Sequence, residues 1–257
     1  MPRLRRKKRT RRKQKGAGRT YVIMIPYRAR GDNHMRKGQL QECLDSIVAS
    51  FTKYNRKYQV IVVEQNNDNL FNYGLLKNIG FVEGEKQSTG SKMYMNMNCD
   101  YTINVDMGFP KEIDDFSGPG FLDVFTMFPG ADVIIGAVAV YDADTYKKVN
   151  GFPNNLVGWG VEDGILCVRA KAMNVPRIQN TVTNNGWIQN RNHDASPRNG
   201  SKEGPNWGRG MANIESKGFL KSNGVNSCVY TVDGDGEFNN ASKNIRHMLV
   251  NFGEIKE

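Results

Sequence analysis

The segment with the richest chemistry in this sequence is residues 150–163, which read NGFPNNLVGWGVED. It ends in two adjacent carboxylates, Glu162 and Asp163, which closely follow the indole of Trp159 and Gly160. A carboxylate can take the proton of an attacking hydroxyl group, and an indole can stack on a sugar or a base. The structural alternative is an acidic helix start, because Asp and Glu are favoured in the first turn of a helix. The combination of an acidic pair, an indole and glycines favours a ligand site.

Other residues could bind a metal or a phosphate. Asp106 ends a short apolar run, with Asn104 two residues earlier, and such oxygen ligands suit Mn²⁺ or Mg²⁺. Arg28 and Arg30 follow another apolar run and could bind a diphosphate. His193 is one of three histidines and could complete a metal shell. Each has a simpler alternative: a turn cap for the aspartate, and solvent exposure for the arginines and the histidine.

Alternating strand-like and helix-like segments predict the fold class that must position these residues. Apolar runs rich in β-forming residues occupy positions 21–27, 58–64 and 101–105, and apolar residues recur at helical spacing over positions 35–54 and 71–81. The order strand, helix, strand, helix, strand predicts an α/β fold with a parallel sheet. Ligands bind such sheets at the carboxyl ends of the strands, where Asp106 and the arginines are expected.

The second half of the chain is less regular. We expect an irregular insertion over residues 110–129, a strand over 132–140, and helices over 144–149 and 162–173. Residues 179–226 are polar and rich in Gly and Asn, which predicts a long loop region that folds over a ligand.

The charge of the chain is concentrated at one end. The 257 residues carry a net charge of +10, but residues 1–19 hold eleven Lys or Arg and no acidic residue. The remaining 25 basic and 26 acidic residues nearly balance. We therefore expect a disordered basic tail over residues 1–19, through which nucleic acid or an anionic membrane surface could bind, and a single domain over residues 20–257.

The sequence contains no run of 18 apolar residues and no apolar core of a signal peptide, so we expect no membrane span. Its four cysteines stand singly, without a CxxC pair. This usage predicts free thiols in a reducing compartment. Together with the missing membrane anchor, it leads us to expect a cytoplasmic protein of viral or microbial origin.

Five segments, in order over residues 20–252, resemble the β-1,4-galactosyltransferase family and its N-acetylgalactosaminyltransferase relatives. They are residues 25–30 (IPYRAR) with His34, residues 62–65 (VVEQ) with 71–72 and 75–81, residues 104–106 (NVD), residues 150–163, and residues 223–227 (NGVNS) with Tyr230. The resemblance implies a GT-A, Rossmann-like fold with a mixed, mainly parallel sheet. It also implies a UDP-sugar donor held through Mn²⁺ or another divalent cation, and inversion at the anomeric carbon.

The resemblance also assigns roles to residues. Asp163 is implied as the catalytic base beside Glu162, and Asp106 and His193 are implied as metal ligands. The acceptor is expected to contact Trp159, Gly160 and Asp163. The donor-binding residues implied in this way are Pro26, Tyr27, Arg28, Arg30, Asp106, Trp159, Gly136 and Ile134.

Departures from the family pattern leave alternatives open. Gly164 stands where the family has an acceptor-contacting aspartate, and Ile134 stands where vertebrate galactosyltransferases have a bulky tyrosine. A smaller aliphatic residue leaves room for an N-acetyl group, so the donor can be UDP-Gal or UDP-GalNAc, with a glycan or glycoprotein acceptor. The alternatives are a transferase like the polypeptide GalNAc-transferases or chondroitin polymerases, and a non-catalytic GT-A domain that binds nucleotide-sugar or glycan.

Overall fold

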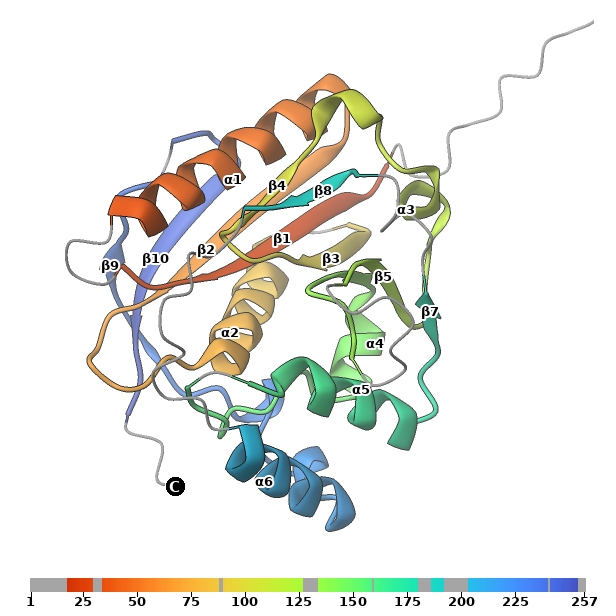
Figure 1. The fold of residues 1–257 in the computed structure, drawn as a ribbon, viewed down its shortest axis with the longest axis vertical. Coiled ribbons are helices and arrows are strands. Elements are labelled where there is room, and N and C mark those ends of the chain that lie inside the picture. The colour runs from red at the N-terminus through yellow and green to blue at the C-terminus, as the bar shows by residue number, and fades with distance from the viewer. Residues whose placement is uncertain are drawn as a thin grey trace, which may run out of the picture.

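The computed structural model describes residues 18–29, 34–87, 90–126, 134–158, 160–179, 186–191, 203–239 and 241–253. These residues are organised around an eight-stranded sheet with the strand order β7-β5-β6-β3-β1-β2-β10-β9 (Figure 1). A separate two-stranded sheet pairs β4 (Tyr101–Ile103) with β8 (Ile188–Asn190).

The centre of the large sheet is parallel. Four neighbouring strands run in the same direction: β3 (Lys92–Asn96), β1 (Thr20–Tyr27), β2 (Lys57–Gln65) and β10 (Ile245–Asn251). The chain leaves β1 for β2 on one side and later returns to β3 on the other side. Such a reversal opens a crevice at the carboxyl ends of the two diverging strands, which is where α/β sheets bind their ligands.

Antiparallel strands extend the sheet at both edges. On the side of β3 lie β6 (Val138–Tyr141) and β5 (Phe121–Phe125), followed by β7 (Arg177–Gln179), which is parallel to β5. On the other side β9 (Thr231–Asp235) pairs with β10. The large sheet is therefore mixed, with a parallel centre.

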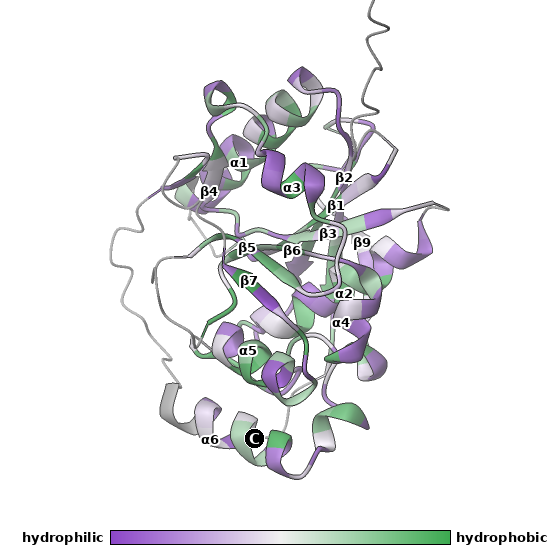
Figure 2. Ribbon diagram, turned by 90° about the vertical axis from the view of Figure 1, so that its right-hand side faces the viewer, coloured by the Kyte–Doolittle hydropathy of each residue, from purple (hydrophilic) through white to green (hydrophobic). Residues whose placement is uncertain are grey.

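Helices cover both faces of the sheet. One face carries α1 (His34–Lys53), and the other carries α2 (Tyr73–Lys86), α4 (Ala143–Lys148) and α5 (Glu162–Ala172). Figure 2 shows these layers edge-on, with α6 (Glu203–Glu215) beyond α5. The short remaining elements are α3 (Lys111–Asp115) and the 3-10 turns η1 (Val105–Met107), η3 (Gly218–Leu220) and η4 (Val225–Ser227).

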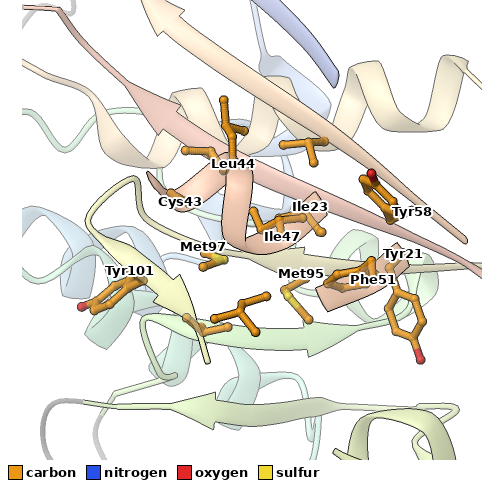
Figure 3. Packing of buried hydrophobic residues seen from close by; sticks show 14 of the residues in the cluster. Tyr21, Ile23, Cys43, Leu44, Ile47, Phe51, Tyr58, Met95, Met97 and Tyr101 are labelled. Atoms are coloured by element: carbon orange, nitrogen blue, oxygen red, sulfur yellow. The ribbon is translucent and has the colours of Figure 1, made fainter. Parts of the chain in front are cut away.

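The alternation of side chains along β1 produces two cores. Tyr21 and Ile23 point to the face of α1, where they pack with Ile47 and Phe51 (Figure 3). Val22 on the opposite side of the strand packs with α2. Because β1 is buried on both faces, it reads in the sequence as a continuous apolar run, as expected for a central parallel strand.

The predicted α/β class and the first four predicted elements are confirmed, but the third parallel strand was assigned to the wrong segment. Residues 101–105 were expected there, whereas β3 occupies that place and residues 101–103 pair with β8 instead. The run of β3, KMYMN, contains polar residues and methionines, and YTI contains residues with higher β-propensity. Propensity therefore favoured the wrong segment, because strand order depends on tertiary packing.

Regular structure also occurs where loops were predicted. The expected insertion over residues 110–129 contains α3 and β5, and the expected loop over residues 179–226 contains β8 and α6. The strand predicted over residues 132–140 is β6, which is shorter and starts later. The predicted basic tail lies almost entirely outside the described residues.

Two further expectations from the sequence concern disulfide bonds and membrane-spanning helices. All four cysteines are free thiols: Cys43, Cys99 and Cys167 are buried, and Cys228 is partly exposed. Among the described residues, no helix has the length and apolar composition needed to cross a bilayer.

Candidate active site

Polar residues follow β1 and β3 at the crevice of the parallel sheet. The amide of Met97 donates to the carbonyl of Met24 at 3.1 Å, so the chain stays beside β1 just after β3 ends. The next residues, Asn98, Cys99 and Asp100, therefore lie at the crevice. Asp100 is 2% exposed, and its carbonyl accepts a hydrogen bond of 2.9 Å from the amide of Arg191 after β8.

Asp106 lies elsewhere. Its side chain is 93% exposed and pairs with Lys53 Nζ at 3.3 Å, in the last turn of α1. The thiol of Cys43, earlier in the same helix, contacts the carbonyl of Asn98 at 3.7 Å. Ten helical residues separate Cys43 from Lys53, which corresponds to about 15 Å. Because α1 runs back toward the start of β2, this distance carries Asp106 away from the crevice.

Asp100 therefore lies at the crevice, whereas Asp106 lies at the exposed end of α1, and the metal-binding role predicted for Asp106 stays a prediction. The sequence contained a signal for Asp100 as well, because the pattern Asn-x-Asp occurs twice, at residues 98–100 and 104–106. Only the first copy follows a strand of the large sheet.

The acidic pair stands at the start of α5, as its sequence predicted. Burial raises the pKa of Glu162 to about 8, and the neighbouring charge of Asp163 adds to the shift. Burial also raises the pKa of half-buried Asp163, to about 6, while Lys77 pulls it down and Asp123 pushes it up. At neutral pH Asp163 is therefore mostly ionised and Glu162 mostly protonated, so Asp163 is the available base.

Helix α2 connects Asp163 with the end of β3. Lys77 is fully buried, and its Nζ donates to the carbonyl of Met97 at 3.2 Å. One turn earlier, the hydroxyl of Tyr73 donates to Asn98 Oδ1 at 3.0 Å. Burial raises the pKa of Tyr73 well above its usual value, and the charge of Asp163 adds to this shift. The base, the lysine and the polar end of β3 thus form one electrostatic cluster.

The segment before β6 also reaches the base. The amide of Ile135 is 3.4 Å from the carbonyl oxygen of Asp163, so Ile134 and Gly136 lie beside the start of α5. The amide of Gly136 donates to Asp123 Oδ1 at 3.0 Å. A Cβ atom at this glycine would lie 2.4 Å from the carbonyl oxygen of Phe125, so no side chain fits there. The structure places this predicted donor-binding segment next to Asp163.

The residues predicted to bind the nucleotide after β1 have packing roles in the structure. Pro26 and Tyr27 are buried in the sheet, where Tyr27 packs edge-on against His247 at a centroid distance of 5.9 Å. Arg28 donates to the carbonyl of Asn69 at 2.7 Å and also to that of Asn67, so it braces the loop after β2. Arg30, Trp159 and His193 lie outside the described residues, and their predicted roles stay predictions.

The first half of the acidic motif is a scaffold. The side-chain Nδ2 of Asn154 donates to the carbonyl of Gly224 at 2.8 Å, and the backbone amide of Asn154 donates to Asn223 Oδ1 at 2.7 Å. Asn78 of α2 donates to the carbonyl of Phe152 at 2.7 Å. These amides join the segment that leads to Asp163 to α2 and to the turn at η4. The recurring asparagines of the sequence are explained by this network.

The described residues form a GT-A fold: a sheet with a parallel centre, Asp100 after one of its central strands and Asp163 at the start of a helix. The family follows from sequence comparison. A model described as the N-terminal region of glycosyl transferase group 7 matches residues 3–108, and one described as the N-terminal domain of galactosyltransferase matches residues 122–185. The chain belongs to the glycosyltransferase 7 family.

Curated relatives agree with this assignment. Mouse β-1,4-galactosyltransferase 1 is 28% identical over 223 residues, which cover 82% of this chain and 50% of the relative. A Lymnaea stagnalis β-N-acetyl-D-glucosaminide β-1,4-N-acetylglucosaminyl-transferase is 26% identical over 170 residues, which cover 63% of this chain and 32% of the relative. The chain thus spans half or less of the length of these relatives.

Solved structures agree on the fold. The catalytic domain of Drosophila β1,4-galactosyltransferase 7, in complex with xylobiose, matches with a TM-score of 0.68 at 16% identity, over 91% of this chain and 95% of that chain. A mutant of that enzyme, in complex with manganese, UDP-Gal and xylobiose, matches with a TM-score of 0.65 at 16% identity, over the same shares of both chains.

Replacing Arg169 by Met should destabilise the protein strongly. The buried guanidinium of Arg169 donates to the carbonyls of Asn150, Gly151 and Asn223, at 3.3, 2.8 and 2.8 Å. Its loss leaves the carbonyls of Gly151 and Asn223 without this donor, whereas the carbonyl of Asn150 keeps the bond from the amide of Val225. We expect the free energy of unfolding to fall by about 3 kcal/mol in chemical denaturation. The matched control is Lys171→Met on an exposed site of α5, with an expected change below about 0.5 kcal/mol. Equal effects of the two variants would contradict this role.

Replacing Val161 by Gly should stabilise the protein. Val161 has φ = 71°, a left-handed conformation in which a β-branched residue is strained. Glycine removes this strain at the cost of a more flexible unfolded chain, and we expect a net gain of about 1 kcal/mol in the free energy of unfolding. Val168→Gly within the same helix is the control and should lose about 1 kcal/mol or more. A loss of stability in Val161→Gly would show that this backbone carries no strain.

Proposed function

We propose that this chain is a metal-dependent, inverting glycosyltransferase that moves galactose or N-acetylgalactosamine from UDP to a hydroxyl group of a glycan. The observation that carries the proposal is the position of Asp163, a half-buried carboxylate at the start of α5 whose backbone carbonyl lies 3.4 Å from the amide of Ile135, within the predicted donor-binding segment. The family assignment and the names of its relatives support the reaction class. The manganese and UDP-Gal in the complex of the Drosophila enzyme support the donor and the metal.

The proposed transfer is a single displacement. The acceptor hydroxyl oxygen attacks the anomeric carbon from the side opposite UDP, and the bond from that carbon to the diphosphate oxygen breaks. UDP leaves with the electron pair, and the hydroxyl proton passes to Asp163. Attack from the opposite side inverts the configuration at the anomeric carbon. Asp163 can act in this way because it is ionised at neutral pH.

The residues at the end of β3 fit a hard divalent cation. Asp100 supplies a carboxylate and Asn98 an amide oxygen, and oxygen ligands suit Mn²⁺ and Mg²⁺. The backbone amide of Arg191, two residues before His193 in the sequence, donates to the backbone carbonyl of Asp100, which supports His193 as a further ligand. When bound, the cation would neutralise the diphosphate and make UDP a better leaving group. Within the described residues, no three His, Cys, Asp or Glu side chains gather into a metal site. We propose His193 as a further ligand on the basis of the family resemblance of its sequence.

The sugar of the donor is proposed to contact the segment that includes Ile134. The backbone amide of the next residue, Ile135, lies 3.4 Å from the carbonyl oxygen of Asp163 at the start of α5. Gly136, the residue after that, leaves no room for a side chain. Ile134 is smaller than the tyrosine of vertebrate galactosyltransferases, so an N-acetyl group is compatible with this position. We therefore include UDP-GalNAc with UDP-Gal as the donor.

Release of UDP with and without Mn²⁺, measured with UDP-Gal, UDP-GalNAc, UDP-GlcNAc and UDP-Glc and a panel of glycan acceptors, tests the proposal. Asp163→Asn should reduce kcat at least 100-fold, because the base is lost. Asp100→Asn should reduce activity to a similar degree by weakening the metal site. Asp106→Asn is the matched control and should retain the activity of the unmodified protein. No UDP release with any donor would refute the transferase, and loss of activity in Asp106→Asn alone would refute the assignment of Asp100.

The pH dependence follows from the shifted pKa of the base. Asp163 is active when ionised, and its pKa is raised to about 6. The rate should therefore be constant above this pH and should fall about tenfold for each unit below it. A plot of kcat/KM against pH checks the acid limb. A limb near the ordinary pKa of an aspartate, about 4, would show that a different group limits the rate.

A further inference from the structure

Asp123 is a buried carboxylate that the proposed mechanism does not use. It lies on β5 between Leu122 and Val124 and is 2% exposed. Its Oδ1 accepts a hydrogen bond of 3.0 Å from the backbone amide of Gly136, and its Oδ2 pairs with the guanidinium of Arg177 on β7. Burial raises the pKa of Asp123, and these two bonds oppose the shift. A buried charge is costly unless it is paired and hydrogen-bonded, and here it is both.

The local geometry of β5 brings this carboxylate to Gly136. Phe121 packs with the core beneath α5, and side chains alternate along a strand, so Asp123 faces α5 as well. The pairing of β5 with β6 shifts register between Asp123 and Phe125, which marks a β-bulge. Bulges redirect side chains and are frequent next to active sites. Gly136 lies two residues before β6 begins, and the carboxylate accepts its amide there.

The segment that contains Gly136 has a second attachment. The amide of Ile135 donates to the carbonyl of Asp163 at 3.4 Å, at the start of α5. Two consecutive backbone amides thus join this segment to β5 and to α5. Ile134, which precedes them and is partly exposed, is the predicted contact of the donor sugar. The bonds that hold residues 135–136 therefore also set the position of that contact relative to the proposed base.

We propose that Asp123 is a positioning residue for the sugar of the donor, because its carboxylate holds residues 134–136 in place beside Asp163. The inference rests on the proposed function and adds a residue that acts through the backbone of another segment. Arg177 supports it by neutralising the carboxylate. The diphosphate is expected at the metal site after β3, so a change at Asp123 should affect the transferred sugar and leave the binding of UDP unchanged.

Two double variants separate positioning from packing. Asp123→Leu/Arg177→Met removes both charges and the acceptor oxygens, and apolar replacement of a buried ion pair is often tolerated. Asp123→Asn/Arg177→Met removes both charges as well but keeps an oxygen that can accept from Gly136. A role of the ion pair in charge or packing predicts that the two variants behave alike. A role in holding Gly136 predicts that they differ.

Calorimetry with Mn²⁺ and without acceptor measures the difference. The probes are UDP and whichever of UDP-Gal and UDP-GalNAc binds more tightly. We expect the Kd of this sugar nucleotide to rise about fivefold in the leucine variant, as for the loss of one net hydrogen bond, and to stay within about twofold in the asparagine variant. The Kd of UDP should not change in either. Equal Kd values for the sugar nucleotide in the two variants, or a parallel rise for UDP, would overturn the proposal.

The amide of Gly136 reports on the geometry directly. Ile-Gly occurs twice in the sequence, at residues 79–80 and 135–136, so ¹³C-carbonyl isoleucine combined with ¹⁵N glycine marks two amides in NMR. The Gly80 signal is identified by its loss in Ile79→Val. Hydrogen exchange at Gly136 should be about fivefold faster in the leucine variant than in the asparagine variant, with Gly80 on α2 unchanged. Equal exchange rates at Gly136 would contradict its attachment to Asp123.

These readouts are separable from the proposed function. Binding of the sugar nucleotide without turnover would refute the transferase, and the Kd values would still decide the role of Asp123. If no sugar nucleotide binds the unmodified protein, both proposals are refuted. Should the leucine variant not fold, the unmodified protein decides: the sugar nucleotide should shift the Gly136 signal more than UDP does, and equal shifts would overturn the inference.

Discussion

The parallel pairing of β3 with β1 determines the position of every polar group in the site. It ends in the hydrogen bond from Met97 to Met24, after which the chain leaves the sheet at the crevice. The carbonyl of Met97 accepts the bond from Lys77, and the side-chain oxygen of the next residue, Asn98, accepts the bond from Tyr73. The carboxyl end of β3 thus supplies two hydrogen-bond acceptors to α2, and the Asp100 carboxylate follows them in the chain. The positions of Asp100 and of the base cluster both follow from this one strand register.

The second constraint is the scaffold that holds the acidic motif. Asparagine side chains and the guanidinium of Arg169 bond to backbone carbonyls over residues 150–154 and 223–227. Backbone groups in such loops would otherwise lack partners once buried, and each missing bond is costly. The network therefore satisfies the backbone groups of a loop that is poor in regular structure. This loop leads directly to the start of α5, where Asp163 lies.

Burial has the largest effect on the pKa values of the two acidic residues in the site. Glu162 and Asp163 are adjacent, yet burial raises the pKa of Glu162 further, to about 8 against about 6. The difference has a physical cause, because Asp163 has the ammonium of Lys77 nearby and Glu162 has only backbone donors. Two neighbouring carboxyl groups thereby acquire different protonation states at one pH. A half-buried base of this kind suits a reaction in which water would compete with the acceptor.

The sequence by itself determined the α/β class, the first two strands and helices, the acidic pair at the start of α5 and the resemblance to the family. These features are local: they depend on the spacing of apolar residues within one segment or on short motifs. Only the tertiary structure decided which of the two Asn-x-Asp copies reaches the crevice, because local propensity favours residues 101–105 as a strand whereas β3 pairs with β1. It also decided that Lys77 is buried with its Nζ on the carbonyl of Met97, and that asparagine side chains join residues 150–154 to α2 and to the turn at η4. The physical reason is that pairing, burial and electrostatic coupling join residues far apart in the chain, and no pattern within one segment records which distant segment it will meet.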